Sequence, residues 1–142
     1  MNVQRKISIN LIRLSTIFVT AYTILMKVGL EIYNMKLIYK TVTNVAGMNY
    51  RKEKVEKAFG LMQSDETNNV KLVREPSNPY DHLAIKVYLE GIFIGYIPKK
   101  GMKQLRKLIQ ETNIIIKAKA TLMYFDINKD QDCVIFIEVW EI

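Results

Sequence analysis

The hydrophobic pattern between residues 37 and 141 changes between two periods, and each period predicts one kind of element. Runs rich in apolar and β-branched residues, ended by glycine, proline or polar residues, predict strands. These runs cover residues 37–46, 70–74, 83–89, 92–97, 113–125 and 133–141. Residues 50–61 and a segment starting at Gly101 instead repeat apolar residues every three or four positions. That spacing predicts two short amphipathic helices.

The segments between these elements complete a predicted order of β-α-β-β-β-α-β-β. Polar loops are expected at Gln63–Asn69 and Asp126–Asp132, and a hairpin turn at Glu90-Gly91. Two short helices are too few to supply the crossovers of a doubly wound parallel sheet. We therefore predict a mostly β, α+β domain, built as a small curved antiparallel barrel of the OB type with about six strands.

Residues 1–34 precede this pattern and are predicted to be an apolar extension of a domain at residues 35–142. Leu14–Met26 is an apolar run bounded by basic residues, shorter than the roughly 20 residues that a membrane span needs. A basic leader before it resembles a signal peptide, although no small-x-small cleavage site follows. Three interpretations stay open: an upstream extension, even an untranslated one, before a natural start at Met35; a membrane-associating helix through residues 11–30; or an additional core helix.

Composition narrows the classes of partner. The chain has 142 residues, 49% hydrophobic and 25% charged, as is usual for one globular domain. A formal net charge of +7 favours an anionic partner, nucleic acid ahead of a membrane surface, although solvated lysines alone would give the same charge. The single cysteine, Cys133, excludes a disulfide within the chain, and with the single histidine, His82, it provides too few ligands for structural zinc. We expect no cofactor or metal, and a reducing, cytoplasmic location.

A proline-containing turn is the most informative motif of the chain. Residues 73–81 read Val-Arg-Glu-Pro-Ser-Asn-Pro-Tyr-Asp and contain two of the three prolines. They lie between two β-rich runs and place an aromatic side chain beside a carboxylate. Because prolines restrict the backbone, a turn of this kind is suited to be a rigid platform for a ligand.

Four blocks of the sequence, including this turn, resemble the HIRAN domain family in their order and spacing. The blocks are Gly47-Met48-Asn49-Tyr50, Arg74–Asp81, Ala84–Val87 and Gly95–Pro98. The similarity covers residues 37–141, and the Arg-Glu-Pro-x-Asn-Pro-Tyr-Asp block is its most specific part. The resemblance implies an OB-like barrel that captures the 3′-hydroxyl end of single-stranded DNA.

The resemblance also implies which residues bind the DNA end. An end-binding pocket is expected from Tyr50, Asn78, Tyr80 and Asp81. Lys99 stands in the position of a phosphate-binding basic residue. Asn49 and Tyr96 stand where eukaryotic family members carry arginine and histidine, a change expected to weaken or re-tune the phosphate contacts. A late aromatic residue completes the site, and Phe125 or its neighbour Tyr124 is the candidate.

These residue types suit the implied role. A carboxylate such as Asp81 accepts a hydrogen bond from a terminal hydroxyl and repels the charge of an internal phosphodiester. Tyrosines stack on bases of any identity, which contributes about 1–3 kcal/mol per base. A dense basic run could follow the phosphate backbone; its members are Lys99, Lys100, Lys103, Arg106 and Lys107.

Each of these residues also has a structural interpretation. Asp81 could do no more than close an Asx-turn, and Tyr50 and Tyr80 could be half-buried rim residues. Asn49 could cap the first helix, and the lysine run could be the solvated face of the second. For Glu75 a structural role is the better interpretation.

The sequence holds no catalytic constellation. It has no glycine-rich phosphate loop, no zinc-ligand spacing and no paired carboxylates around an apolar stretch. We expect a non-catalytic module, not an enzyme, that binds single-stranded DNA ends in repair, replication or mobile-element DNA metabolism. Its expected partners are DNA and a helicase or nuclease supplied in trans, without a small-molecule substrate. Two alternatives stay open: a protein–protein docking barrel that meets an acidic partner, and a membrane-tethered accessory domain.

Overall fold

The structure is a computed structural model. It describes the backbone of residues 3–123 and 132–142, and the side chains of residues 10–30, 34–123 and 132–142. The chain divides into two compact units, one ending at Met35 and one spanning Lys36–Glu141. Each unit is described by itself.

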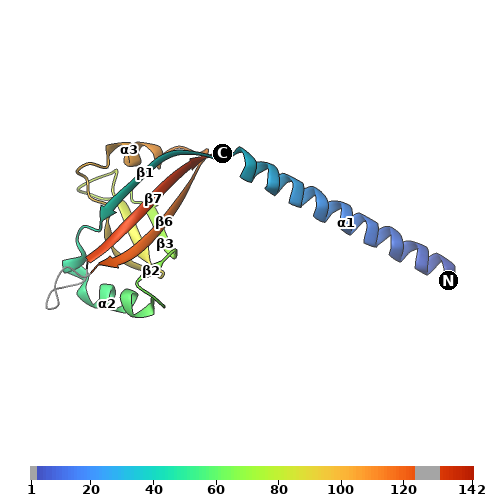
Figure 1. Ribbon diagram of the computed structural model, residues 1–142, viewed down its shortest axis with the longest axis horizontal. Coiled ribbons are helices and arrows are strands. Elements are labelled where there is room, and N and C mark those ends of the chain that lie inside the picture. Colours follow the sequence, from blue (N-terminus) through green and yellow to red (C-terminus); the bar gives the residue numbers. More distant parts are fainter. Residues whose placement is uncertain (1–2, 124–131) are drawn as a thin grey trace. The chain divides into compact units, whose positions relative to one another are not determined.

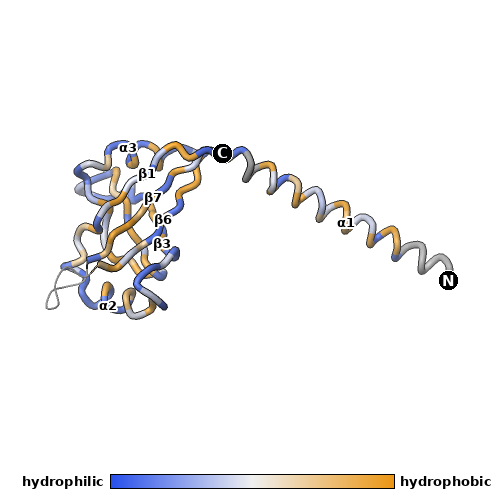
Figure 2. Tube along the Cα trace, viewed as in Figure 1, coloured by the Kyte–Doolittle hydropathy of each residue, from blue (hydrophilic) through white to orange (hydrophobic). Residues whose placement is uncertain are grey.

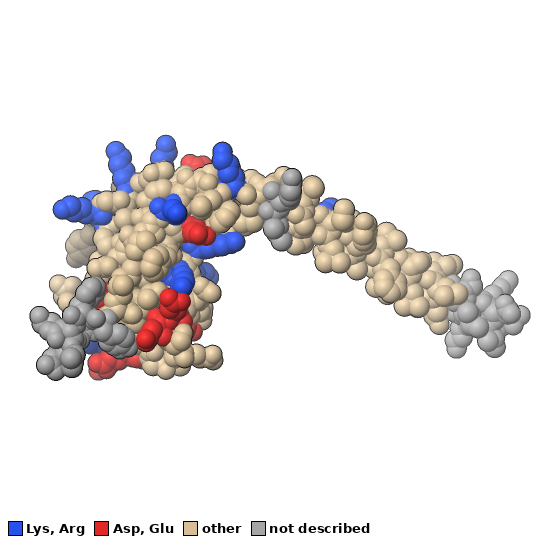
Figure 3. Space-filling view, viewed as in Figure 1, with Lys and Arg blue, Asp and Glu red and all other residues tan. Residues whose placement is uncertain are grey.

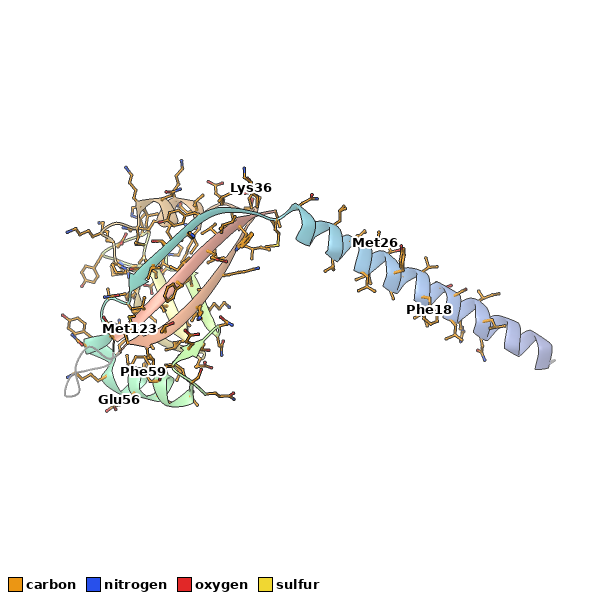
Figure 4. The ribbon with its side chains drawn as sticks, in the orientation of Figure 1. Phe18, Met26, Lys36, Glu56, Phe59 and Met123 are labelled. Atoms are coloured by element: carbon orange, nitrogen blue, oxygen red, sulfur yellow. The ribbon has the colours of Figure 1, made fainter. Side chains whose placement is uncertain are left out.

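The first unit is one long helix, α1 (Val3–Asn34). The side chains of residues 10–30 are exposed, as Phe18 and Met26 show in Figure 4. Apolar residues recur along α1 (Figure 2), and among residues 10–30 only Arg13 and Lys27 are charged.

The apolar part of α1 is longer than the predicted run Leu14–Met26. The segment Asn10–Leu30 has 21 residues and is long and apolar enough to cross a membrane. The prediction of too short a run was therefore wrong, because Arg13 and Lys27 lie within the segment near its ends instead of bounding it. A signal sequence or the core helix of a soluble protein meets the same criterion, so the three interpretations of this segment stay open.

The second unit is built from two antiparallel sheets (Figure 1). The four-stranded sheet has the order β1-β7-β6-β2 and the three-stranded sheet the order β3-β4-β5. The strands of the larger sheet are β1 (Lys36–Asn44), β2 (Glu66–Thr67), β6 (Ile114–Met123) and β7 (Asp132–Glu141). The strands of the smaller sheet are β3 (Val70–Arg74), β4 (Ile85–Leu89) and β5 (Ile92–Tyr96).

The described part of this unit also has three short helical segments: η1 (Met48–Arg51), a 3-10 turn, α2 (Lys52–Leu61) and α3 (Lys103–Leu108). The apolar spacing explains the two α-helices, since Val55 and Ala58 of α2 and Leu105 of α3 are buried in the core. Figure 4 shows Phe59 and Glu56 on the same helix α2, and Phe59 packs against the core as a partly buried residue.

The core lies between the two sheets and beneath the helices. Its largest fully buried side chains come from both sheets and from α3: Ile85, Val87, Leu89, Ile94, Leu105, Cys133, Ile135, Ile137 and Val139. Within this core Cys133 is a free thiol, and burial raises its pKa to about 12. The prediction of a buried strand cysteine is confirmed.

The mostly β class and the two short helices are confirmed. One detail was wrong, because residues Glu66–Thr67 of the expected loop Gln63–Asn69 form β2. The described strands form two sheets and no closed barrel, an arrangement that is compatible with the predicted curved OB-like barrel without confirming its details. The two-residue β2 exists because it pairs with Thr121 and Ala120 of β6, a contact that local sequence does not encode. The expected loop 126–132 lies outside the described residues except for Asp132, which begins β7.

One bridge joins the larger sheet to the smaller. Immediately after β1, the backbone of Ala46 exchanges two hydrogen bonds with Tyr96 of β5, with N···O distances of 2.8 and 2.9 Å. The two backbones approach so closely that a Cβ on Gly95 would lie 2.3 Å from the Ala46 carbonyl oxygen. The bridge between Ala46 and Tyr96 therefore requires glycine at position 95, because no side chain fits there.

Candidate nucleic-acid interface

The proline-containing turn is held by its own polar groups. Asn78 Oδ1 accepts hydrogen bonds from the backbone N–H of Tyr80 (2.9 Å) and of Asp81 (3.0 Å). The two ends of the turn are joined by a hydrogen bond from the Glu75 N–H to the Ala84 carbonyl at 2.9 Å. These bonds fix the backbone while leaving the Tyr80 side chain 94% exposed. Asn78 thus positions the turn, and Tyr80 is presented to solvent.

Glu75 ties this turn to the smaller sheet. Its Oε1 forms an ion pair with Lys86 Nζ of β4 at 2.5 Å. Its Oε2 accepts one hydrogen bond from Asn78 Nδ2 at 2.8 Å and another from the Tyr96 hydroxyl at 2.9 Å. The hydrogen bond from Lys86 is the main cause that lowers the pKa of Glu75 to about 2, with Asn78 second. The predicted structural role of Glu75 agrees with these contacts.

Burial and the hydrogen bond to Glu75 raise the pKa of Tyr96. Its hydroxyl is engaged with a carboxylate and its ring packs edge-on against Phe93, with ring centroids 5.3 Å apart. Tyr96 is thus partly buried, and its hydroxyl connects β5 to Glu75.

The segment that carries Tyr50 starts directly after the junction of the two sheets. Gly47, the residue directly before η1, has a φ of 81°, a left-handed conformation that favours glycine. Arg51 donates to the Gly47 carbonyl at 2.8 Å, and its guanidinium lies 5.5 Å from the centroid of the Tyr96 ring. On this segment the Tyr50 side chain is 90% exposed.

For Tyr50, Tyr80 and Asn49 the sequence also allowed structural roles. Tyr50 and Tyr80 are not half-buried rim residues, since both are almost fully exposed. Asn49 is exposed and is not a helix cap, because the residue preceding α2 is Arg51 and the one preceding η1 is Gly47.

Asp81 is held by a buried arginine. Nη2 of Arg106 on α3, which is only 8% exposed, donates to both carboxylate oxygens of Asp81. Asp81 Oδ1 also accepts from the Leu83 N–H at 3.1 Å, which closes the Asx-turn that the sequence suggested. Partial desolvation works to raise the pKa of Asp81, but the bonds from Leu83 and Arg106 and the charge of Lys99 outweigh it and lower the pKa.

This ion pair corrects one expectation. Arg106 was grouped with the lysines that follow the phosphate backbone, yet it is buried against Asp81. The other members of the basic run are exposed, and Figure 3 shows lysine and arginine side chains gathered where α3 lies: Lys99, Lys100, Lys103 and Lys107.

The contacts connect four of the predicted site residues, Asn78, Tyr80, Asp81 and Tyr96, into one continuous network. It runs from η1 through Arg51 and Tyr96 to Glu75, then through Asn78 to the backbone of Tyr80 and Asp81. Tyr124 and Phe125 lie outside the described residues. Among the described residues no group of three or more His, Cys, Asp or Glu side chains could hold a metal ion.

The sequence did not indicate that Arg51 belongs to this site. It did indicate Arg106, but as an exposed phosphate contact and not as the buried partner of Asp81. Arg106 follows Met102 by four residues, so it lies next to the apolar stripe of α3, which is a signal of burial. Arg51 offered no comparable signal, because its partners Phe93 and Tyr96 lie far from it in sequence.

Fold and site together define a small, mostly β domain that presents exposed tyrosines and lysines beside a rigid turn, a combination typical of single-stranded nucleic-acid binding. The HIRAN domain family model matches residues 38–141, and the chain belongs to this family of nucleic-acid-binding modules. The suspected resemblance is confirmed.

One solved structure, the first of two similar ones, supports the same fold. The HIRAN domain of human HLTF is 24% identical, with a TM-score of 0.52, and the match covers 75% of this chain and 79% of that chain. A protein from Lactobacillus plantarum is 21% identical with a TM-score of 0.49, covering 73% of this chain and 100% of that chain. No curated protein matches the chain.

Proposed function

We propose that the domain binds single-stranded DNA and prefers a free 3′-hydroxyl end. The observation that carries the proposal is the exposure of Tyr50 and Tyr80, at 90% and 94%, on segments fixed by hydrogen bonds. Large aromatic side chains left in water on a rigid backbone are suited to stack on unpaired bases. Family membership supports the class of ligand.

Asp81 is the group proposed to recognise the end. Each carboxylate oxygen has two lone pairs; Oδ1 accepts from Leu83 and Arg106, whereas Oδ2 accepts only from Arg106 among the described residues. A terminal hydroxyl can donate to the remaining lone pair of Oδ2, and a phosphodiester oxygen has no proton to donate.

Arg106 changes the proposed basis of end selectivity. Its charge, together with that of Lys99, offsets much of the negative charge of Asp81. Repulsion of an internal phosphodiester is therefore weaker than the bare carboxylate would give. Selectivity then depends mainly on the missing hydrogen bond, since an internal phosphodiester cannot supply the charge-assisted bond that a terminal hydroxyl donates to Asp81.

The exposed lysines beside α3 are proposed to contact the phosphates. The charge of Lys99 acts on Asp81, and Lys100 and Lys103 follow Lys99 closely in sequence. Contacts of this kind are independent of base sequence and weaken with salt.

Fluorescence anisotropy with labelled single strands tests the proposal. Strands ending in a 3′ hydroxyl or a 3′ phosphate are titrated against the wild type, Asp81→Ala and Asp81→Asn. We expect tighter wild-type binding to the hydroxyl end, and about a tenfold or greater fall in that preference in both variants. Thermal melts confirm that each variant is folded. Equal wild-type affinity for the two ends would reject end recognition.

We further propose that the unit Lys36–Glu141 carries this function alone, in the cytoplasm, with any helicase or nuclease acting in trans. A fragment of residues 35–142 is then expected to bind DNA as tightly as the full chain. Carbonate extraction of both forms from membranes tests α1 separately: retention of the full chain alone would support a membrane tether. A loss of DNA binding in the fragment would contradict the proposal.

A further inference from the structure

We propose that Glu75 is a positioning residue that holds the Tyr50 segment and the Tyr80–Asp81 turn in one fixed arrangement for a DNA end. The inference rests on the proposed function and goes beyond it, because Glu75, at the start of the turn, is not itself among the residues proposed to contact the DNA. It is 20% exposed and contacts three partners from three parts of the fold: Lys86, Asn78 and Tyr96.

Toward the turn, the contact passes through Asn78. Glu75 Oε2 accepts from Asn78 Nδ2 at 2.8 Å, which leaves Asn78 Oδ1 directed at the N–H groups of Tyr80 and Asp81. The carboxylate thereby fixes the orientation of the amide, since a flipped amide would place N–H groups against N–H groups. The direction in which Tyr80 leaves the turn depends on this orientation.

Toward η1, the contact passes through Tyr96. Its hydroxyl donates to Glu75 Oε2 at 2.9 Å, and its backbone is paired with Ala46, one residue before Gly47. The Arg51 guanidinium lies over the rings of Phe93 and Tyr96, with 4.5 and 5.5 Å to the ring centroids. The residue before Arg51 is Tyr50, so the position of Tyr96 sets the position of the η1 segment.

The charge of Glu75 makes the role testable. The lysine beside it and the arginine over the adjoining rings leave this cluster with a positive balance. Glu75→Gln removes a negative charge, so long-range electrostatics alone predicts tighter binding of a polyanion. Loss of positioning predicts weaker binding to the free end, because Gln cannot accept from Lys86, Asn78 and Tyr96 together. The two effects have opposite signs.

Glu90 is a matched control on the β4–β5 hairpin, which also carries the Glu75 partners Lys86 and Tyr96. It is also hydrogen-bonded, to Thr67 at 2.6 Å and to Asn69 at 2.9 Å, and these bonds likewise lower its pKa. It lies in the β4–β5 turn, at the opposite end of the two strands from the pair Lys86 and Tyr96. Glu90→Gln changes the charge equally without touching the proposed network.

The experiment compares wild type, Glu75→Gln, Glu90→Gln and Tyr96→Phe by anisotropy on strands with 3′-hydroxyl and 3′-phosphate ends, with thermal melts as a folding control. We expect Glu75→Gln to weaken binding of the hydroxyl end about tenfold, with the phosphate end unchanged or tighter. Tyr96→Phe, which removes only the hydroxyl, is expected to act in the same direction by about threefold. Glu90→Gln is expected to leave the ratio of the two affinities unchanged.

A folded Glu75→Gln that binds the hydroxyl end as tightly as Glu90→Gln does would overturn the inference. If the wild type shows no end preference, the proposed function fails, and a double-mutant cycle on single-strand affinity still decides the role of Glu75. Tyr50→Ala and Tyr80→Ala are combined in the wild-type and Glu75→Gln backgrounds. If the two tyrosine substitutions are energetically coupled in the wild type but not in Glu75→Gln, Glu75 positions the two segments. Equal coupling energies in both backgrounds contradict that role.

Discussion

Replacing Gly95 by alanine tests the junction on which the site is built. The change adds one methyl group where β5 meets Ala46. That carbon would lie 2.3 Å from the Ala46 carbonyl oxygen and 2.7 Å from Val45 Cγ1. Both distances are far below van der Waals contact, and the nearer atom belongs to backbone, which cannot turn away as a flexible side chain can. The Ala46–Tyr96 pair must therefore separate.

The expected cost follows from this geometry. Overpacking a well-packed site typically destabilises by about 1–3 kcal/mol, and contact with backbone places this case at the upper end. Part of the loss is the pair of hydrogen bonds at 2.8 and 2.9 Å between Ala46 and Tyr96. Binding of single strands is expected to weaken as well, because the Tyr50 segment begins beside this pair.

Urea unfolding followed by circular dichroism measures the change. The control is Gly60→Ala, since Gly60 lies within α2 and a Cβ there meets nothing within 4 Å. That substitution is expected to stabilise by about 0.5–1 kcal/mol, because alanine is a better helix former than glycine. The same chemical change thus has opposite signs at two positions. A Gly95→Ala midpoint equal to that of the wild type, with an unchanged m-value, would refute the reasoning.

Three further results are expected. Tyr50→Ala and Tyr80→Ala should each weaken single-strand binding by about 1–3 kcal/mol while leaving the melting temperature unchanged, since both side chains are exposed; a large melting shift would contradict this. Lys99→Ala combined with Lys103→Ala should weaken binding to all sequences alike and reduce the slope of log K against log salt by roughly 1.4 in titrations at several salt concentrations, whereas an unchanged slope would place both lysines outside the interface. Because the pKa of Glu75 falls from 4.5 to about 2 on folding, its contribution to stability is present above pH 4.5 and is lost as the pH falls through about 2. Between pH 6 and pH 2, the free energy of unfolding should therefore decrease less with falling pH in Glu75→Gln than in the wild type. Equal decreases in the two proteins would contradict the linkage.

The sequence carries the class of the fold because that class depends on local periodicity. Alternating and continuous apolar runs marked the six longer strands, and residues 70–74 were predicted without error. The partition into two sheets depends on pairings such as that of Lys36 with Glu141, which lie too far apart in sequence for local pattern to encode. The predicted strand at residues 83–89 began two residues early, because the Asp81 carboxylate binds the Leu83 N–H and extends the turn.

For the site, the sequence indicated which residues are candidates for binding better than it indicated which side chains they contact. The turn with Tyr80 and the tyrosine at position 50 were identified through the family resemblance, and their exposure agrees with a binding role. The pairing of Asp81 with Arg106 could not be derived, since α3 reaches the turn only in the folded domain. The partners of Glu75 were equally hidden, because they come from β4, β5 and the turn itself.

The buried thiol described above has a practical consequence. Cys133 is the chain's one cysteine and its thiol, with a pKa of about 12, stays protonated and covered at neutral pH. Maleimide reagents attack thiolates that they can reach, so the native protein should resist labelling. A cysteine introduced on an exposed loop would then be the sole attachment point for a fluorophore, with no native residue removed.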